Sequence, residues 1–346
     1  MIFGKKPRMM EKFKKHYDRH KNNNFIVGGQ KEFAPWSVIL NYDNKCNLKC
    51  QHCFTKSSLG DFGKPTLTID DVKNLADQAD ELGVYEFDIQ GGEPLMNKDL
   101  FKILEVIDTS RFYTYITTNG WFLDEQMAQK LADAGVDKVD ISIDSFTPEE
   151  HDEFRGRKGV YERAMKAAEY VQKAGMRAYF SITVGSYNAQ SKELEDFTKF
   201  AASKNIGIVV NCASPSGAWK GNYDIMMNDE DSKKIEELRK NNPEIIRDNW
   251  NILNTKELVV GCPTVNFFYI NPYGDVLPCV YIHTTMGNIK EKPLKEILLN
   301  GFNYKYFNTL TDKCLSGENK EFAKKYLSQN ASVMSPVPIE EFFENN

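Results

Sequence analysis

The sequence has 346 residues, of which 41% are hydrophobic and 27% charged, and its formal net charge is −5. This composition is typical of a soluble globular protein, and no apolar run approaches the roughly 20 residues that a membrane-spanning helix requires. Basic residues at the N-terminus are followed by no apolar stretch, so we expect no secretory signal and a cytoplasmic location. Seven cysteines, an odd number, fit reduced thiols that act as ligands better than a secreted disulfide framework.

The first 21 residues form a basic segment. They hold eight Lys or Arg residues against Glu11 and Asp18, a net charge of +6, so the remaining residues must carry −11 to give −5. Four apolar side chains recur in it at helical spacing: Met9, Met10, Phe13 and Tyr17. This spacing predicts a short helix within a basic N-terminal segment, residues 1–35. We expect the helix to pack on the body of the protein; docking of an acidic partner is the alternative, and nucleic-acid binding is not expected.

Between residues 36 and 222, short apolar runs alternate with amphipathic helical stretches. This alternation is typical of repeated βα units that build a parallel sheet. Six strands are predicted: Ser37–Asn41, Tyr85–Ile89, Tyr113–Thr117, Lys138–Ile143, Arg177–Val184 and Gly207–Asn211. We therefore expect an α/β fold, a partial (β/α)6 TIM-like barrel over residues 36–222.

The pattern changes beyond residue 222. A polar helical stretch predicts a connecting helical segment over residues 223–260, and residues 261–346 are expected to form a small α+β domain. Within that domain the turn sequence Asn271–Gly274 predicts a β-hairpin. The expected elements are a helix at Asp229–Lys240, strands at Asn266–Ile270 and Val276–Ile282, and helices at Pro293–Leu299 and Glu321–Leu327. A domain of this size builds little core, so metal binding could stabilise it.

Three cysteines lie within eight residues after the first predicted strand: Cys46, Cys50 and Cys53. Cysteine is the ordinary protein ligand of iron–sulfur clusters, and three cysteines on a four-iron cluster leave one iron without a protein ligand. That iron can hold a reactant. The alternative is a zinc site, which would need four nitrogen or sulfur ligands and could recruit His52.

The CxxxCxxC spacing after the first strand of a six-unit βα chain resembles the radical S-adenosylmethionine (SAM) superfamily. The sequence Gly91-Gly92-Glu93-Pro94 after the second strand looks like the GGEP motif of that superfamily, whose backbone and carboxylate hold the methionine amino group of SAM. Further positions are similar to SAM-contacting residues of the superfamily: Asn119 in Thr118-Asn119-Gly120, Ser142, Asp144, and Arg155 as the partner of the SAM carboxylate.

All these motifs fall at the carboxyl ends of predicted strands, where parallel βα sheets and barrels bind their ligands. Taken singly each has a simpler explanation, such as a tight turn for the glycines or a solvated polar side chain for Ser142 and Arg155. Their convergence over residues 36–212 supports the resemblance.

The resemblance implies an enzyme that reductively cleaves SAM to a 5′-deoxyadenosyl radical, which abstracts hydrogen from an unactivated carbon. The implied cofactors are SAM and a SAM-binding [4Fe–4S] cluster with an open iron. The implied partners are an electron donor such as flavodoxin or ferredoxin and a small-molecule or peptide substrate.

A second cysteine group brackets the predicted hairpin: Cys262, Cys279 and Cys314. Eleven residues separate Cys262 from Gly274 and four more precede Cys279, which resembles the opening of the SPASM and twitch extensions that carry auxiliary four-iron clusters. The later cysteine run of a full SPASM domain is missing, so we expect a twitch-like domain with one auxiliary [4Fe–4S] cluster. Its fourth ligand position could be open or filled by His283 or Asp275. Ordinary buried cysteines are the alternative.

Cys212 ends the sixth predicted strand. A thiol that faces the barrel there could donate hydrogen to a carbon radical, as in some radical epimerases, although a small core residue is the interpretation we favour. The substrate is less constrained by the sequence. About 35 residues precede the barrel, fewer than a usual peptide-recognition domain, which favours a small metabolite such as a sugar or tetrapyrrole over epimerisation or crosslinking of a ribosomal peptide. A non-catalytic iron–sulfur or zinc protein is a further alternative.

Overall fold

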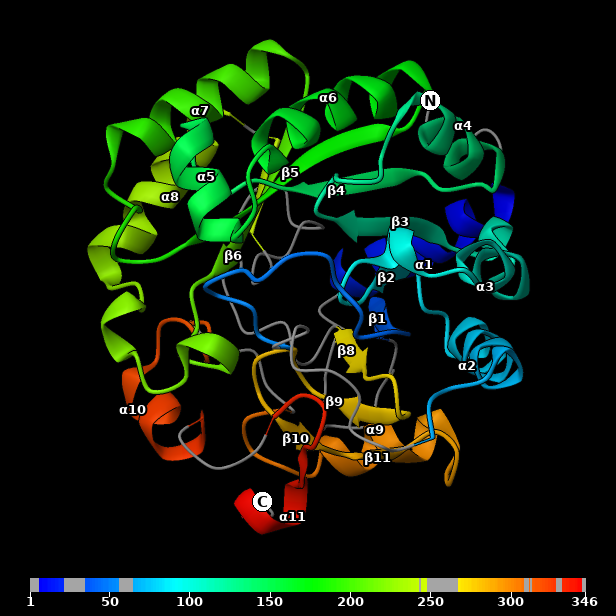
Figure 1. The fold of residues 1–346 in the computed structure, drawn as a ribbon. Coiled ribbons are helices and arrows are strands. Elements are labelled where there is room, and N and C mark those ends of the chain that lie inside the picture. Colours follow the sequence, from blue (N-terminus) through cyan, green and yellow to red (C-terminus); the bar gives the residue numbers. More distant parts are fainter. Residues whose placement is uncertain are drawn as a thin grey trace.

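The computed structural model describes residues 6–21, 35–55, 65–242, 244–247, 267–307, 311, 313–327 and 332–343. Six strands pair in parallel in chain order, and helices cover the outer side of their curved sheet (Figure 1). These strands are β1 (Ser37–Asn41), β2 (Glu86–Gln90), β3 (Tyr113–Thr118), β4 (Lys138–Ser142), β5 (Arg177–Val184) and β6 (Gly207–Cys212). The expected α/β fold with a partial (β/α)6 barrel is confirmed.

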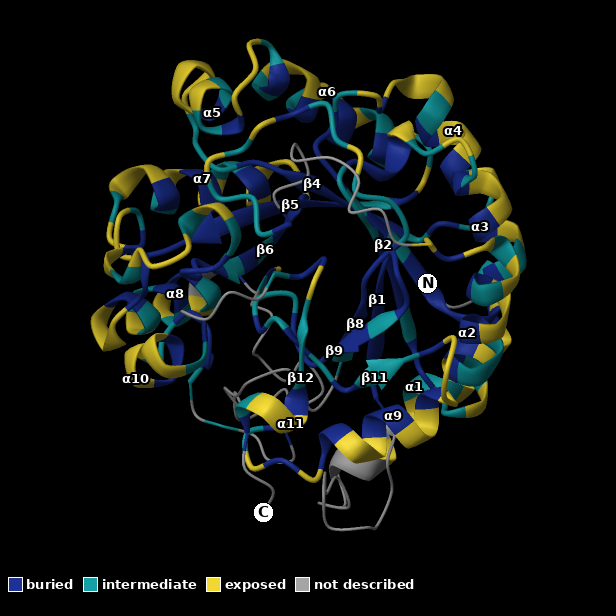
Figure 2. Ribbon diagram, turned by 60° about the horizontal axis from the view of Figure 1, so that its bottom comes forward, coloured by how far each residue is buried: buried dark blue, intermediate teal, exposed yellow. Residues whose placement is uncertain are grey.

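The helices that follow the strands press apolar faces onto the sheet. The first of them begins with a capping box, in which the side chains of Thr68 and Asp71 each accept a hydrogen bond from the other residue's backbone amide. Its buried residues share one hydrophobic core with Phe87 and Ile116, and Figure 2 shows the buried sheet inside a ring of helices with exposed outer sides. The barrel helices are α2 (Ile69–Glu81), α3 (Leu100–Ile107), α4 (Glu125–Asp133), α5 (Pro148–Arg155), α6 (Val160–Lys173), α7 (Lys192–Ser203) and α8 (Asp229–Asn241).

The basic N-terminal segment contains the expected helix, α1 (Pro7–Lys21), and it packs on the amino ends of the barrel strands. Met9 is fully buried against Tyr85 and Tyr113. The Lys6 ammonium group donates to the Gly135 carbonyl at 2.7 Å and to Asp137 at 2.5 Å. Packing on the body is therefore confirmed for this helix, which covers the end of the barrel away from the cysteine loop.

Short strands extend the barrel sheet at both of its edges. On one side β7 (Ile245–Arg247) pairs in parallel with β6. On the other, β8 (Phe267–Ile270) pairs in parallel with β1, and β9 (Asp275–Leu277) is antiparallel to β8. The predicted hairpin is thus present, but it continues the barrel sheet and builds no sheet of its own. The resulting ten-stranded order is β11-β9-β8-β1-β2-β3-β4-β5-β6-β7.

The C-terminal region packs against the open side of the barrel. Ile39 of β1 lies in a small core with Tyr269 and Leu277 of the hairpin and with Val333. The remaining elements are β10 (Thr284–Thr285), β11 (Gly287–Asn288), α9 (Leu294–Gly301), α10 (Lys320–Phe322), the π-helix η7 (Ala323–Leu327), β12 (Val337–Pro338) and α11 (Ile339–Phe342). Among the described helices none is long and apolar enough to cross a bilayer.

Candidate active site

The cysteine loop leaves the carboxyl end of β1 and is bound to the Gly91-Gly92-Glu93 turn after β2. The Gly92 amide donates to the Asp43 carbonyl at 2.8 Å, and the Glu93 amide donates to the Lys45 carbonyl at 2.7 Å. A Cβ atom on Gly92 would lie 2.2 Å from the Lys45 carbonyl oxygen, and one on Gly91 would lie 2.6 Å from that of Asp43. Only glycine allows this approach, so the turn fixes the backbone immediately before Cys46.

Polar groups surround the three cysteine sulfurs, none of which forms a disulfide. The Leu48 amide donates to Cys46 Sγ at 3.4 Å, and the Arg155 guanidinium donates to Cys50 Sγ at 3.8 Å. Burial raises the pKa of the Cys46 thiol to about 12, so a bound cation such as iron is needed to hold it as a thiolate. Hydrogen bonds of this kind are those that tune iron–sulfur clusters.

The surroundings of the loop fit a cluster. Five residues on the cysteine loop and after β6 have buried polar atoms without a hydrogen-bond partner: the side-chain amide atoms of Asn44, Asn47 Nδ2, His52 Nδ1, and the Ser214 and Ser216 hydroxyls. In the described part of the chain, no three His, Cys, Asp or Glu side chains converge as ligands of a single metal ion. A zinc site needs such convergence, whereas a four-iron cluster binds each thiolate on a different iron. The ring of His52, the possible zinc ligand, stacks on Phe154 with 4.8 Å between the ring centroids.

The Glu93 carboxylate joins the turns after β2 and β3. It accepts hydrogen bonds from Thr118 Oγ1 at 2.6 Å, from the Asn119 amide at 2.8 Å and from the Leu95 amide at 3.0 Å. Asn119 in turn donates its side-chain amide to Asn47 Oδ1 at 2.9 Å, beside Cys46. The predicted SAM-contacting residues Glu93 and Asn119 therefore lie together against the cysteine loop.

Asp144 and Arg155 form a buried ion pair, with Arg155 nitrogens 2.5 and 2.7 Å from Asp144 Oδ2. Burial alone would raise the pKa of Asp144, but the guanidinium and nearby histidines more than offset this and hold that pKa at about 2. The Asp144 amide donates to His151 Nδ1 at 3.1 Å. Because Arg155 also reaches Cys50, the structure brings this predicted pair to the cysteine loop.

The inner face of the barrel sheet is polar. Phe87 of β2 packs beneath the helices, so the next residue, Asp88, points to the inner face. On β4 the same alternation turns Lys138, Asp140 and the predicted SAM contact Ser142 inward.

Asp88 and Asp140 form an acidic pair on this inner face. Asp88 accepts hydrogen bonds from Gln90 at 2.5 Å and from Thr117 at 3.3 Å, and Asp140 Oδ2 pairs with Lys138 at 2.9 Å. Asp140 Oδ1 is buried without a hydrogen-bond partner. Burial raises the pKa of Asp88 well above its usual range, and the charge of Asp140 raises it further. The acidic pair thus combines an acceptor that has no hydrogen-bond partner with a carboxyl group whose pKa burial raises.

The acidic pair is not among the site residues predicted from the sequence. Its signal was a carboxylate between two apolar residues in the middle of each of two buried strands, EFDIQ and KVDIS. Buried charge in such a strand is costly without a partner or a ligand.

The structure describes two of the three C-terminal cysteines. Cys279 and Cys314 are both buried, whereas Cys262 lies outside the described residues. The Tyr281 amide donates to Cys279 Sγ at 3.4 Å, which repeats the arrangement at Cys46. Asp275, a possible fourth ligand, has its carboxylate bound to the side-chain amides of Asn271 and Asn288 at 2.9 and 3.0 Å, so it closes the hairpin turn. The other possible ligand, His283, follows Cys279 by four residues; its carbonyl accepts the Val337 amide.

Cys212 does not join the inward-facing group. It alternates with Asn211, whose side chain donates to the inward Ser181 at 2.8 Å, and shares the helix-side core with Ile208. A Cβ atom on Gly317 would lie 2.4 Å from Cys212 Cβ, so the thiol-bearing residue packs on the C-terminal region. The position of Cys212 in β6 therefore supports the small core residue that we favour over a hydrogen donor facing the barrel.

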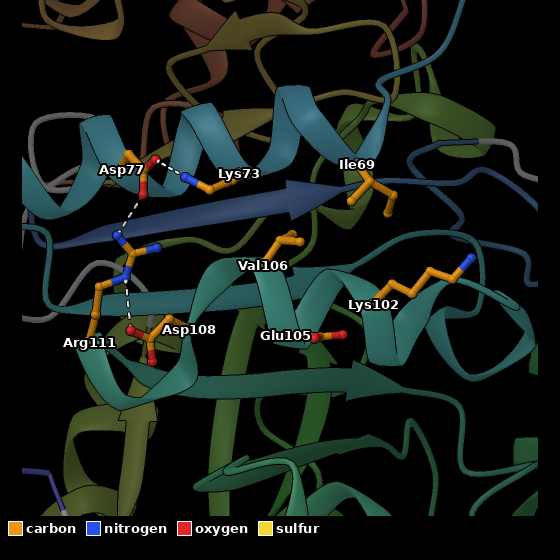
Figure 3. Close-up of a pocket in the computed structure, with 8 residues that line it drawn as sticks. All are labelled: Ile69, Lys73, Asp77, Lys102, Glu105, Val106, Asp108 and Arg111. Carbon is orange, nitrogen blue, oxygen red and sulfur yellow. Dashed lines mark hydrogen bonds and ion pairs between the residues drawn. The ribbon is translucent and has the colours of Figure 1, made fainter.

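A groove on the outer surface, between α2 and α3, includes none of these residues (Figure 3). The Arg111 guanidinium forms ion pairs across the groove with the carboxylates of Asp77 at 2.8 Å and Asp108 at 3.8 Å, and Lys73 also pairs with Asp77. Four of its six charged side chains are thus paired with one another, and the groove lies outside the barrel.

Strand ends that gather three cysteines, a glycine-rich turn and a buried Asp–Arg pair define an iron–sulfur enzyme on a partial barrel. Residues 40–201 match the radical SAM superfamily, and residues 262–322 match SPASM, an iron–sulfur cluster-binding domain. The chain belongs to the radical SAM superfamily and carries a SPASM-type C-terminal region. Its cofactors are therefore SAM, the SAM-binding [4Fe–4S] cluster and auxiliary iron–sulfur cluster binding in the SPASM region. This membership sets aside the alternative of a non-catalytic iron–sulfur or zinc protein.

Relatives in this superfamily act on different substrates. The AdoMet-dependent heme synthase of Methanosarcina barkeri is 28% identical over 77% of this chain and 83% of its own length. The PqqA peptide cyclase of Rhizobium meliloti is 26% identical over 88% of this chain and 87% of its own length. The solved structure of Streptococcus suis SuiB bound to precursor peptide SuiA shares the fold, with a TM-score of 0.60 and 19% identity over 82% of this chain and 67% of that one.

Proposed function

We propose that this protein cleaves SAM reductively and uses the 5′-deoxyadenosyl radical to abstract hydrogen from an unactivated C–H group of a small, amine-bearing metabolite. The observation that carries the proposal is the vacant acceptor of the acidic pair, Asp140 Oδ1, on the inner face of the barrel. In barrels the substrate binds at the carboxyl ends of the strands, over this face.

The charge of the inner face discriminates between substrate classes. A buried acceptor left without a donor costs about 1–3 kcal/mol, which a substrate N–H group would recover. An ammonium group would also favour ionisation of Asp88, whose pKa burial raises. A tetrapyrrole bears several carboxylates and offers no ammonium group to the open oxygen of Asp140. An aminated sugar therefore fits this acceptor better than a tetrapyrrole does.

The chain's own residues would orient SAM. Cys46, Cys50 and Cys53 would hold the cluster, which supplies the electron for C–S cleavage when bound. Glu93 would position the methionine amino group, since its carboxylate has roughly four acceptor sites and the protein fills three of them. Arg155, fixed by Asp144, would present a cation to the SAM carboxylate.

A second candidate is the modification of a ribosomal peptide by epimerisation or crosslinking. It is favoured by the similarity to the PqqA peptide cyclase over 88% of this chain. A lysine or N-terminal amine of such a peptide would offer the acidic pair the same cationic group.

The proposal is tested by following the transfer of deuterium from a labelled substrate to 5′-deoxyadenosine. Cells that make the protein are grown on deuterated medium, and their extract is separated by size and then on cation- and anion-exchange columns. Each fraction is incubated anaerobically with the reduced, cluster-loaded protein and unlabelled SAM. The fraction that contains the substrate raises the mass of 5′-deoxyadenosine by one deuterium.

We expect the label from a small-molecule fraction that a cation exchanger retains, and we expect Asp140→Asn to reduce the labelled share about tenfold while total SAM cleavage persists. Labelling by a peptide fraction would select the second candidate. Labelling by an anion-exchange fraction would overturn the amine assignment. Absence of any 5′-deoxyadenosine from wild-type protein would overturn the whole proposal.

A further inference from the structure

One surface beside the cysteine loop is basic, although the chain as a whole is acidic. It gathers five exposed cations, which we call the basic patch: Lys49, Arg157, Lys158, Arg163 and Lys166. They come from the cysteine loop, the turn between α5 and α6, and helix α6. Three exposed carboxylates, Glu153, Glu162 and Glu169, lie in or next to the same segments, so the five cations still outnumber them.

Trp121 holds the centre of the basic patch together. The Arg157 and Arg163 guanidinium carbons lie 3.6 and 4.1 Å from its ring centroid, and Arg163 donates to the Trp121 carbonyl at 3.1 Å. Lys158 adjoins Arg157 in the chain, and Lys166 lies one turn beyond Arg163 on α6. Because the ring fixes the two guanidinium groups in advance, a partner that docks on them loses less side-chain entropy.

The basic patch is in direct contact with the cysteine loop. Arg157 Nη1 donates to the Asn47 carbonyl at 3.3 Å, and Asn47 follows Cys46 in the chain. The Lys49 amide, between Cys46 and Cys50, contacts the Arg155 carbonyl at 3.4 Å. One hydrogen bond and one peptide unit therefore separate the patch from a predicted cluster ligand.

An exposed apolar side chain completes this surface. Phe122 is 39% exposed and follows Trp121 directly. A small apolar spot ringed by charges of one sign suits a brief encounter between electron-transfer proteins, which bury little area and rely on charge to steer their approach.

We propose that the basic patch is the docking site of a small acidic protein that delivers one electron to the cluster held by Cys46, Cys50 and Cys53. This proposal rests on the proposed function, which consumes one electron for each SAM cleaved. The docked donor is oxidised by one electron, the cluster is reduced by the same electron from its 2+ to its 1+ state, and no proton or group is transferred.

The chain offers a matched control surface on α1. Lys14 and Lys15 are exposed there, at the opposite end of the barrel from the cysteines. Lys158→Glu with Lys166→Glu, and Lys14→Glu with Lys15→Glu, change the net charge by the same amount. The two double variants therefore differ only in where the charge is reversed, and a Lys158→Gln with Lys166→Gln variant supplies an intermediate step.

The probe is flavodoxin, an acidic one-electron donor. Reduction of the cluster by flavodoxin hydroquinone is followed by stopped-flow absorbance at about 0.05 M salt, and binding of oxidised flavodoxin to the cluster-loaded protein is measured by calorimetry. We expect the patch variant to lose about tenfold in both the rate and the affinity, with the glutamine variant between it and wild type. The difference should shrink at about 0.5 M salt, where charges are screened.

Dithionite separates this proposal from the proposed function. With dithionite as reductant, the patch variant should form 5′-deoxyadenosine at the wild-type rate. Equal flavodoxin rates in wild type and patch variant, or an equal loss in the α1 control, would overturn the docking site. Failure of wild-type protein to cleave SAM with dithionite would instead overturn the proposed function, while the flavodoxin rates would still test the patch.

Discussion

Glu93 Oε2 accepts the backbone amide hydrogen of Asn119 at 2.8 Å, so one buried carboxylate connects the turns after two neighbouring barrel strands. Its other oxygen accepts from Thr118 and Leu95. Burial raises the pKa of Glu93, and these hydrogen bonds oppose that rise. Glu93 therefore shapes the site even before any ligand arrives.

Glu93→Gln should both destabilise the protein and weaken SAM binding. All three hydrogen-bond partners of the Glu93 carboxylate named above are donors, so the amide nitrogen of glutamine would leave at least one buried N–H or O–H group unpaired, at about 1–3 kcal/mol. Urea unfolding and SAM titration measure the two effects. Glu105→Gln, at an exposed position of α3, is the control. Equal stability of the two variants would contradict the connecting role.

Gly92→Ala should reduce iron binding at the cysteine loop. Its Cβ atom would lie 2.2 Å from the Lys45 carbonyl, so the backbone before Cys46 must move. Gly175→Ala is the matched control, because its Cβ would meet no atom within 4 Å and only its positive φ of 82° is strained, at about 1–2 kcal/mol. Iron assays after reconstitution should show a loss of about four irons in Gly92→Ala only. Full iron content there would refute the steric argument.

The two cysteine groups should hold iron independently. Wild-type protein should bind about eight irons, and Cys46→Ala should retain about four with no SAM cleavage. Cys279→Ala with Cys314→Ala should also retain about four, but should still form 5′-deoxyadenosine with dithionite. Iron assays and chromatography of the nucleoside distinguish these outcomes; full iron content in the second variant would make those cysteines ordinary core residues.

The stability of the protein should rise with pH between about 4 and 6.5, partly through His151. Burial, assisted by Arg155, lowers the pKa of His151 to about 4, while the unfolded chain has a pKa near 6.5. The unfolded state thus binds more protons in this window, and His151 contributes stability that is full above pH 6.5 and lost as the pH falls toward 4.

His151→Asn tests this contribution, since asparagine keeps an acceptor for the Asp144 amide but does not titrate. Unfolding midpoints at pH 7.5, 6.5 and 5.5 should show a shallower slope in the variant, by up to about 1.4 kcal/mol per pH unit. Burial also lowers the pKa of His52, so part of the slope should remain. Parallel curves for wild type and variant would count against the assignment.

Cys212→Ala should leave product formation intact. The residue lies on the helix side of β6 and packs on Gly317, so the variant should lose about 1 kcal/mol of stability and no chemistry. Product yield and denaturation are compared with wild type. SAM cleavage without product would restore Cys212 as a hydrogen donor.

The local part of this structure could be predicted. Strand and helix periods gave the six βα units nearly to the residue, because buried parallel strands and capped helices carry local signals. The motif residue Glu93 follows the second strand as predicted, whereas Arg155 ends helix α5 and reaches the strand ends through its side chain. The face of β6 on which Cys212 lies could also have been predicted, because strand alternation puts it on the same side as the apolar residues Ile208 and Val210.

Long-range pairings could not be read in this way. The pairing of β8 with β1 joins segments about 230 residues apart, and a four-residue strand carries no sign of its parallel partner. The hydrogen bonds that Asp275 accepts from the side chains of Asn271 and Asn288 depend on how these side chains lie across the turn, which the sequence pattern does not specify. The basic patch arises because Trp121 and Arg157 meet only when successive βα turns converge.

The pairing of β8 with β1 has a consequence for any shortened form of the protein. It makes β1 an inner strand with neighbours on both sides. A barrel cut off before residue 267 would leave the β1 backbone as a bare sheet edge, ready to pair with strands of other chains. The C-terminal region thus protects the strand that leads to Cys46 from aggregation, independently of any iron it binds.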